Sequence, residues 1–162
     1  MNTSEQQRII ASVCATLAAR GTPLSDGLVS VDHFGDSAAL SSALLALIVS
    51  GKKRGGASLH AAYAIEELPV PQVGEIRIVL DFNDKPILVS RNTAVDIVPF
   101  HAVGADFAAC EGEGEGEAAG TLAYWRIAHR DYFTRNCLEF GLVFNEDMLV
   151  VCERFEVLHF LS

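Results

Sequence analysis

Apolar residues recur at helical spacing near the start of the chain. They repeat at intervals of three and four residues: Ile10, Val13, Cys14 and Leu17. Ser4 and Gln7 resemble a capping box before them, so we expect an amphipathic helix that ends at Gly21. The segment 21–35 is rich in turn residues and predicts a connecting loop, with a short apolar turn at 28–31.

A second helix is expected before a basic segment. Asp36 and Ser37 are suitable caps, and Gly51 supplies a left-handed stop. Between them, four apolar residues share one helical face: Leu40, Leu44, Leu47 and Ile48. The helix leads into the hinge, which we define as residues 50–58, where three consecutive cations lie among glycines.

The remainder of the chain predicts mostly strands. Apolar runs, several with alternating positions, occur at 57–65, 75–82, 87–98 and 149–160. A short helix is expected at 102–110 and a long one at 121–140. Because helices do not alternate regularly with strands, a doubly wound sheet is disfavoured. The Glu-Gly-Ala tract 111–120 is interpreted as a mobile surface loop without a core residue.

Composition limits the classes of function. The 162 residues are 50% hydrophobic, enough for one core without a metal or disulfide. A net charge of −9 argues against binding long duplex DNA, which requires many cationic phosphate contacts. The four cysteines show no metal spacing, and no secretory signal or membrane span is recognised. We therefore expect a cytoplasmic protein with reduced cysteines, no cofactor and no metal.

The hinge is the first candidate for chemistry. Lys52, Lys53 and Arg54 would attract an anion, and the glycines at 51, 55 and 56 would let the backbone approach it closely. The competing interpretation is an ordinary solvated charge run. The pattern is not a P-loop, because GxxxxGK[ST] is absent.

Other candidates lie on the long predicted helix and in the acidic tract. His129 falls inside an apolar arc, with Arg126 and Arg130 beside it, so these three could converge with the hinge. The alternative for His129 is a hydrogen-bonded core histidine. The alternating glutamates offer a general base or cation ligand, or only a solvated tract: Glu111, Glu113, Glu115 and Glu117. Ser58 is the hydroxyl nearest the cations, and otherwise an ordinary strand serine.

Several separate motifs, in order, resemble the ASCH domain family of the PUA-like superfamily. They are Phe34-Gly35-Asp36-Ser37, Gly51-Lys52-Lys53, Pro71-Gln72-Val73-Gly74, Val98-Pro99-Phe100, Glu111-Gly112-Glu113-Gly114, Leu122-Ala123-Tyr124-Trp125-Arg126 with His129, Asp147-Met148, and Val151-Cys152-Glu153-Arg154-Phe155. The resemblance implies an α+β fold, a small β-barrel packed with helices. It places an N-terminal helical extension at 1–30 and the ASCH domain at 31–162.

The resemblance also implies functions. Family members are associated with RNA or modified-nucleoside binding, and some are hydrolases, including a ribonuclease and an amidohydrolase of acetylated cytidine. The residues of that amidohydrolase correspond here to Lys53, Gly56 and Glu111, and Gly56 has no hydroxyl to act as nucleophile. Ser58 shares a strand face with position 56 and is the candidate to replace the missing nucleophile, although it lies roughly 7 Å further along.

Three functional hypotheses follow. In the first, single-stranded RNA or a nucleotide-like ligand binds a basic cleft. Its phosphate would meet the hinge cations, with Arg126 and His129 beside them, and its bases would stack on aromatic residues: Tyr63, Tyr124 or Trp125. The second is a hydrolase with Lys53 stabilising negative charge and Glu111 as base. The third is an interaction domain, with a homodimer formed through Ile10, Val13 and Leu17.

Overall fold

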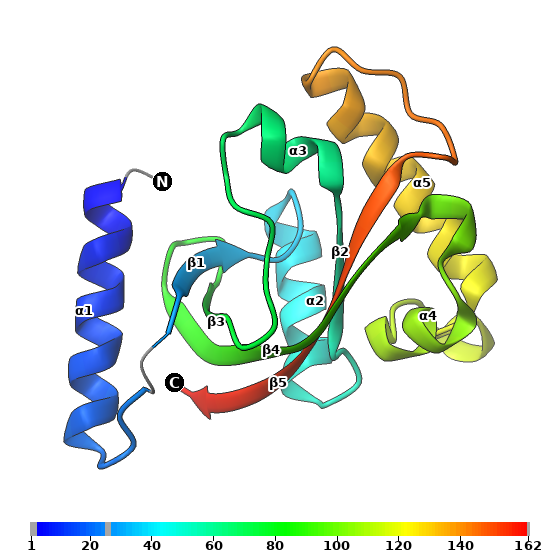
Figure 1. Cartoon of the computed structure of the whole chain (residues 1–162). Coiled ribbons are helices and arrows are strands. Elements are labelled where there is room, and N and C mark those ends of the chain that lie inside the picture. Colours follow the sequence, from blue (N-terminus) through cyan, green and yellow to red (C-terminus); the bar gives the residue numbers. More distant parts are fainter. Residues whose placement is uncertain (1–2, 25–26, 162) are drawn as a thin grey trace. The chain divides into compact units, whose positions relative to one another are not determined.

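The computed structural model describes residues 3–24 and 27–161. Figure 1 shows its elements, which are, in chain order, α1 (Thr3–Ala19), β1 (Val29–His33), α2 (Ala38–Val49), β2 (Gly55–Leu59), α3 (His60–Ile65), β3 (Ile76–Leu80), β4 (Pro86–Pro99), η1 (Phe100–Ala102), α4 (Ala105–Glu111), η2 (Gly116–Ala118), α5 (Leu122–Glu139) and β5 (Leu149–Phe160). The mixture of helices with a largely antiparallel sheet confirms the expected α+β class.

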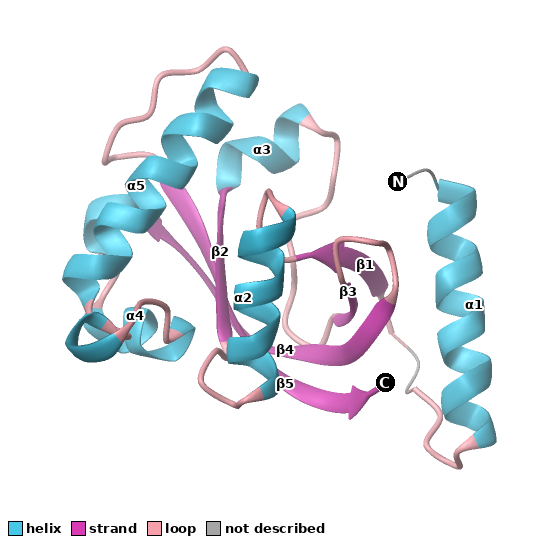
Figure 2. Ribbon diagram, turned by 180° about the vertical axis from the view of Figure 1, so that it is seen from behind, coloured by secondary structure: helices cyan, strands magenta, loops and turns pink. Residues whose placement is uncertain are grey.

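Hydrogen bonding orders the strands β1-β3-β4-β5-β2 (Figure 2). β1 runs parallel to β3, with Val29 opposite Ile76. β3 pairs antiparallel with β4, and β2 pairs antiparallel with β5, which sets Gly55 opposite Arg154. The second half of the hinge therefore lies in β2, and pairing with β5 fixes its register.

The chain forms two compact units, although its length suggested one core. The first comprises residues 1–46, 73–93 and 155–162. Its buried cluster joins one face of α1 to the sheet: Val13, Leu17, Ile76, Ile78, Leu80 and Val89. Val13 and Leu17, which the sequence offered as a dimer face, are buried within the unit because α1 contacts β1 and these two side chains cluster with those of β3.

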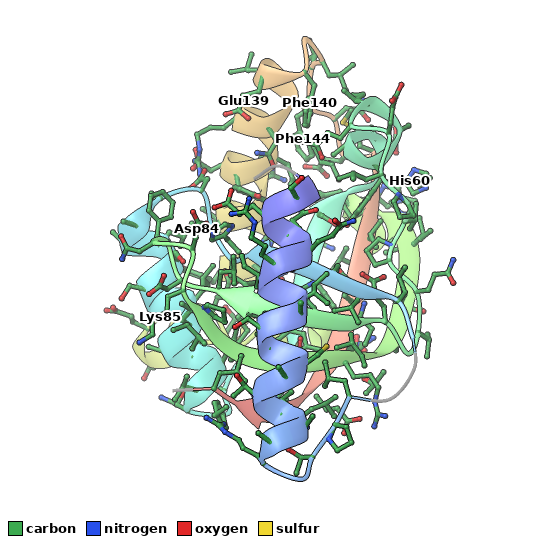
Figure 3. The ribbon with its side chains drawn as sticks, turned by 90° about the vertical axis from the view of Figure 1, so that its left-hand side faces the viewer. His60, Asp84, Lys85, Glu139, Phe140 and Phe144 are labelled. Atoms are coloured by element: carbon green, nitrogen blue, oxygen red, sulfur yellow. The ribbon has the colours of Figure 1, made fainter. Side chains whose placement is uncertain are left out.

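The second unit comprises residues 47–72 and 94–154. Its core is rich in aromatic side chains from η1, α4 and α5: Phe100, Phe107, Trp125 and Phe133. α5 ends at Glu139 with Phe140 as its C-cap, and Phe144 lies in the segment that follows (Figure 3). The Phe144 ring packs edge-on against that of Phe100. α5 contacts α4, and α4 contacts β2, so the hinge strand and both helices share this core.

Local signals set several of the helix ends. The Ser37 hydroxyl accepts a hydrogen bond from the Leu40 N–H, and Thr121 caps α5 by accepting from the Tyr124 N–H. Gly51 and Gly141 adopt φ of +84° and +70° just beyond α2 and α5. Capping and stop residues act over a few residues, which is why the ends of α2 at Ser37 and Gly51 could be predicted from the sequence.

Three expectations were wrong. The segment 21–35 is not only a loop, because β1 pairs with the distant β3. A strand was expected at 57–65, but β2 ends at Leu59 and the following residues form α3. A short apolar run with several alanines suits either structure. The tract 111–120 does contain a core residue: Glu111 is the last residue of α4 and is only 1% exposed.

Two further findings concern the chain as a whole. All four cysteines are unbridged, as the sequence predicted. Within residues 3–24 and 27–161, none of the helices has the length and hydropathy that crossing a membrane requires.

Candidate functional site

The hinge is held on both sides by backbone hydrogen bonds. The N–H groups of Lys52 and Lys53 donate to the Leu47 carbonyl at 2.9 and 3.0 Å, which closes the last turn of α2. The Arg54 N–H donates to the Cys110 carbonyl at 2.8 Å, which ties the hinge to the end of α4. The hinge is therefore an ordered connection between α2, β2 and α4.

The three cations of the hinge point to different surroundings. Lys52 is exposed, whereas Lys53 is 1% exposed and Arg54 is half-buried. The Arg54 guanidinium donates to the carbonyl oxygens of Ile48 and Lys53, both at 2.7 Å. The hinge thus does not present its charges together, because two of the three side chains fold back into the protein.

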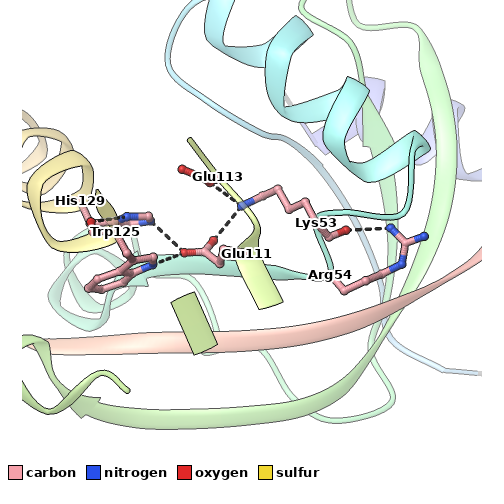
Figure 4. A network of polar contacts seen from close by, with 6 residues as sticks. All are labelled: Lys53, Arg54, Glu111, Glu113, Trp125 and His129. Atoms are coloured by element: carbon pink, nitrogen blue, oxygen red, sulfur yellow. Dashed lines mark hydrogen bonds and ion pairs between the residues drawn. The ribbon is translucent and has the colours of Figure 1, made fainter. Parts of the chain in front are cut away.

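Lys53 lies at the centre of a buried polar cluster, which we call the Lys53 cluster: Lys53, Glu111, Glu113, Trp125 and His129 (Figure 4). The Lys53 Nζ lies 2.8 Å from Glu111 Oε1 and 2.5 Å from Glu113 Oε1. The other oxygen of Glu111 accepts from Trp125 Nε1 and lies 3.0 Å from His129 Nε2. Glu111 therefore contacts three donor groups and is closed to solvent.

The charges in the cluster stabilise one another. Burial alone would raise the pKa of Glu111, but the charge of Lys53 and the hydrogen bond from His129 hold that pKa well below its ordinary value. Burial alone would lower the pKa of Lys53, but the charges of Glu111 and Glu113 outweigh it and raise that pKa. Both groups are therefore ionised at neutral pH.

His129 is positioned by the helix that carries it. Its ring stacks on the Trp125 ring, one turn earlier, with centroids 4.2 Å apart. Its Nδ1 lies 3.0 Å from the Trp125 carbonyl oxygen, and its Nε2 faces the Glu111 carboxylate. Both neighbours are acceptor oxygens, so the ring is held between two fixed contacts.

Two glycines allow the hinge and α4 to approach so closely. A Cβ on Gly55 would lie 3.1 Å from Glu111 Cγ. Gly112 adopts φ of +61°, and a Cβ there would lie 2.3 Å from the Lys52 carbonyl oxygen, closer than any real contact. The close approach at Gly112 therefore depends on the absence of a side chain.

Glu113 is the member of the cluster that reaches toward solvent. Its side chain is 16% exposed. The glycines on either side of it fix its neighbours: Gly112 packs against exposed Lys52, and a Cβ on Gly114 would lie 3.1 Å from the ring of Tyr124. Tyr124 is 37% exposed. The Glu113 backbone thus lies between two glycines, one packed against the Lys52 backbone and the other against the Tyr124 ring.

Other residues predicted from the sequence lie elsewhere. Ser58 and Tyr63 are half-buried and share a 2.7 Å hydrogen bond between their hydroxyl oxygens. Ser58 occupies the strand face opposite Ala57 and Leu59, which pack with the core of the second unit. The Arg126 guanidinium donates to the His101 carbonyl at 2.9 Å, and Arg130 pairs with Glu146. The structure therefore brings His129 to Lys53, and it directs both arginines toward other partners.

The cluster also offers ligand atoms to a metal ion. Glu111, Glu113 and His129 each present one such atom, and these atoms lie within 4.8 Å of one another. The Lys53 ammonium already contacts both carboxylates, so a metal ion would have to displace it. The arrangement is that of a site with an internal cation.

Sequence reasoning gave Glu113 no special place among the alternating glutamates. Its pairing with Lys53 depends on the turn at Gly112, which is not visible in the alternating Glu-Gly pattern. The one usable signal was the glycine following a predicted short helix, which marks a left-handed helix end.

Known domains resemble this chain in sequence and in structure. The sequence matches the family model described as an ASCH domain over residues 30–159. An ASCH domain crystal structure from Lactobacillus crispatus is 35% identical, covers 93% of this chain and 89% of its own, and superposes with a TM-score of 0.73. The crystal structure of a protein from Enterococcus faecalis is 30% identical in sequence. The match covers 98% of this chain and 91% of that one, with a TM-score of 0.78. No curated protein matches the sequence significantly.

Proposed function

Because the chain belongs to the ASCH domain family, we propose that it binds single-stranded RNA or a nucleotide-like ligand beside Glu113. The supporting observation is the half-buried Glu113 carboxylate, held by Lys53, with Gly112 packed against the Lys52 backbone before it and Gly114 against the Tyr124 ring after it. These three side chains offer different contacts to a nucleotide. The family resemblance, which associates such domains with RNA or modified nucleosides, supports the same class of ligand.

Each part of a nucleotide has a suitable neighbour in this arrangement. The exposed ring of Tyr124 offers a stacking surface for a base, an interaction that tolerates different bases. The Glu113 carboxylate is an acceptor for an exocyclic amino group such as that of cytosine. The exposed ammonium of Lys52 is available to a phosphate.

Lys53 has a supporting role in this proposal. The sequence suggested that Lys53 meets phosphate. Its ammonium is instead buried and contacts two carboxylates, so it is not available to a phosphate. It instead fixes the position of the Glu113 carboxylate and offsets its charge. Since the Lys53 ammonium is already paired with two carboxylates, phosphate is expected at Lys52.

The proposal is tested by fluorescence anisotropy with a panel of short, labelled single-stranded RNAs and with nucleotides as competitors. Tyr124→Ala removes the stacking surface and should weaken binding by about tenfold, since one stacked base contributes about 1–3 kcal/mol. Glu113→Gln and Lys52→Gln should each weaken binding, and Lys52→Gln should also reduce its salt dependence.

The matched control is Glu117→Gln, which makes the same chemical change at an exposed position of the same tract. It should bind as the natural chain does. If the natural chain binds neither RNA nor nucleotides, or if Tyr124→Ala and Glu113→Gln bind normally, the proposal is wrong.

The alternative function is hydrolysis of RNA or, with less support, of an acylated cytidine. A buried cluster of ionisable groups favours it, because such clusters are common in active sites. Glu111 is, however, occupied by three donor groups and its pKa is lowered, which makes it a weak base. Gly56 also lacks the hydroxyl expected of the amidohydrolase.

The two functions are separated by turnover. The natural chain, Lys53→Met and Glu111→Gln are incubated at high concentration with short RNAs and with acetylated cytidine, and products are followed by chromatography. Product formation by the natural chain that both variants lose while they remain folded, as checked by circular dichroism, would establish the hydrolase. Binding without any turnover would remove it.

A further inference from the structure

A second candidate site lies in the same unit as the Lys53 cluster, and none of the residues of that cluster lines it. It is a pocket of about 220 Å³ at the end of β4 and the start of α4. We call it the Arg154 pocket and define it by six of its lining residues: Asp96, Val98, Val103, Asp106, Phe107 and Arg154.

Arg154 organises the polar side of this pocket. Its Nη1 lies 3.1 Å from Asp96 Oδ2 and its Nη2 lies 2.6 Å from Asp106 Oδ2, so one guanidinium holds two carboxylates that are ten residues apart. The guanidinium also lies 5.3 Å from the centre of the Phe107 ring. The carboxylates are therefore fixed in place without help from a ligand.

The accessible charge of the pocket is negative. The side chains of Asp96 and Asp106 are 59% and 79% exposed, whereas that of Arg154 is 28% exposed. Two carboxylates and one guanidinium sum to a charge of −1. An anion would meet a cation that is already paired and two carboxylates that face solvent, so the pocket disfavours phosphate.

The remaining walls are apolar or uncharged. Val98 is half-buried, and Val103 and Phe107 are buried. Cys152 also lines the pocket, and burial raises the pKa of its thiol to about 12, so it stays neutral. Hydrocarbon beside a pair of carboxylates suits a molecule with an apolar stem and a cationic head.

We propose that the Arg154 pocket binds a primary alkylammonium group, with its head on Asp96 and Asp106 and its short stem against Val98, Val103 and Phe107. The pocket is smaller than the roughly 300–1,000 Å³ of sites for drug-sized ligands, which limits the stem to a few carbons. The group belongs to a free amine or to a lysine side chain, and both share this chemistry. The inference does not depend on the proposed RNA site.

The test is an NMR titration of the full chain with n-butylammonium, observed through the methyl groups of Val98 and Val103. We expect saturable shifts in these methyl groups. n-Butanol, which lacks the charge, and butyrate, which reverses it, should bind at least about tenfold more weakly. A parallel titration with Nα-acetyl-lysine methylamide separates the two sources: binding only by the simple amine indicates a free small molecule, and comparable binding by both includes lysine side chains.

The variant arm uses Asp96→Asn with Asp106→Asn, which removes both charges at nearly constant shape. We expect butylammonium affinity to fall by about tenfold or more. Asp147→Asn, an exposed aspartate outside the lining, is the matched control and should bind normally. If the double variant unfolds, the three-ligand comparison on the natural chain decides the question. The proposal is overturned if butylammonium shows no saturable binding, or if butanol or butyrate binds equally well. It is also overturned if a folded double variant binds butylammonium as tightly as the natural chain.

Discussion

The Lys53 ammonium lies 2.8 Å from Glu111 Oε1, and both side chains are almost completely removed from water. An ion pair in this setting stabilises the fold only while it is complete, since each charge alone would be costly to bury. Glu113 and His129 complete the contacts of the pair. This dependence leads to the first two predictions.

Removing the charge of Lys53 should destabilise the protein strongly. Lys53→Met leaves Glu111 and Glu113 without their cation and should lower the free energy of unfolding by about 3–5 kcal/mol. Urea denaturation measures the change. Lys52→Met, in the exposed neighbour, should change it by less than about 0.5 kcal/mol. Equal effects of the two variants would show that the pair contributes nothing particular to folding.

Stability should fall in acid partly because of Glu111. Its pKa is lowered in the folded protein, so the unfolded chain takes up the proton at a higher pH than the folded one. The resulting stabilisation is present above the ordinary pKa of 4.5 and is lost as the pH falls below it. The free energy of unfolding should therefore differ more between the natural chain and Glu111→Gln at about pH 7 than at about pH 3. A difference that grows on acidification would contradict this assignment.

The contact between Gly112 and Lys52 provides a test of the backbone. Gly112→Ala places a Cβ 2.3 Å from a carbonyl oxygen at φ of +61°, and it should lower the free energy of unfolding by more than about 2 kcal/mol. Gly116→Ala is the control, because Gly116 has φ of +56° with no atom near the added Cβ. It carries only the cost of the left-handed conformation, about 1 kcal/mol. Thermal and urea unfolding of both variants measure the difference, which should disappear if the hinge shifts freely away from α4.

Cys152 should resist alkylation in the folded protein. Burial raises the pKa of its thiol to about 12 from an ordinary 9.0, so the reactive thiolate is about a thousandfold rarer at mildly alkaline pH. Mass spectrometry of iodoacetamide-labelled peptides, before and after unfolding in urea, measures this protection. Half-exposed Cys14 serves as the internal reference and should label first. Labelling of Cys152 at the rate of Cys14 would contradict its burial.

Neighbouring residues made much of the fold predictable. Ser37 and Thr121 cap helices within four residues of themselves, and Gly51 ends α2 from the adjacent position. The apolar periodicity of α1 and α5 placed Leu17, Trp125 and Phe133 on buried faces. β1 and the switch from β2 to α3 were missed because short apolar segments take their conformation from partners far along the chain.

The candidate site was likewise predictable from the sequence only in part. From the sequence alone came the family, the hinge, and the choice of Lys53, Glu111 and His129 as residues of interest. Only the tertiary structure decided that Lys53 is buried between two carboxylates, that Glu113 is its second partner, and that Asp96 and Asp106 meet at Arg154. The physical reason is range: caps and periodicity act within a few residues, whereas the ion pairs of the two sites join segments up to 60 residues apart.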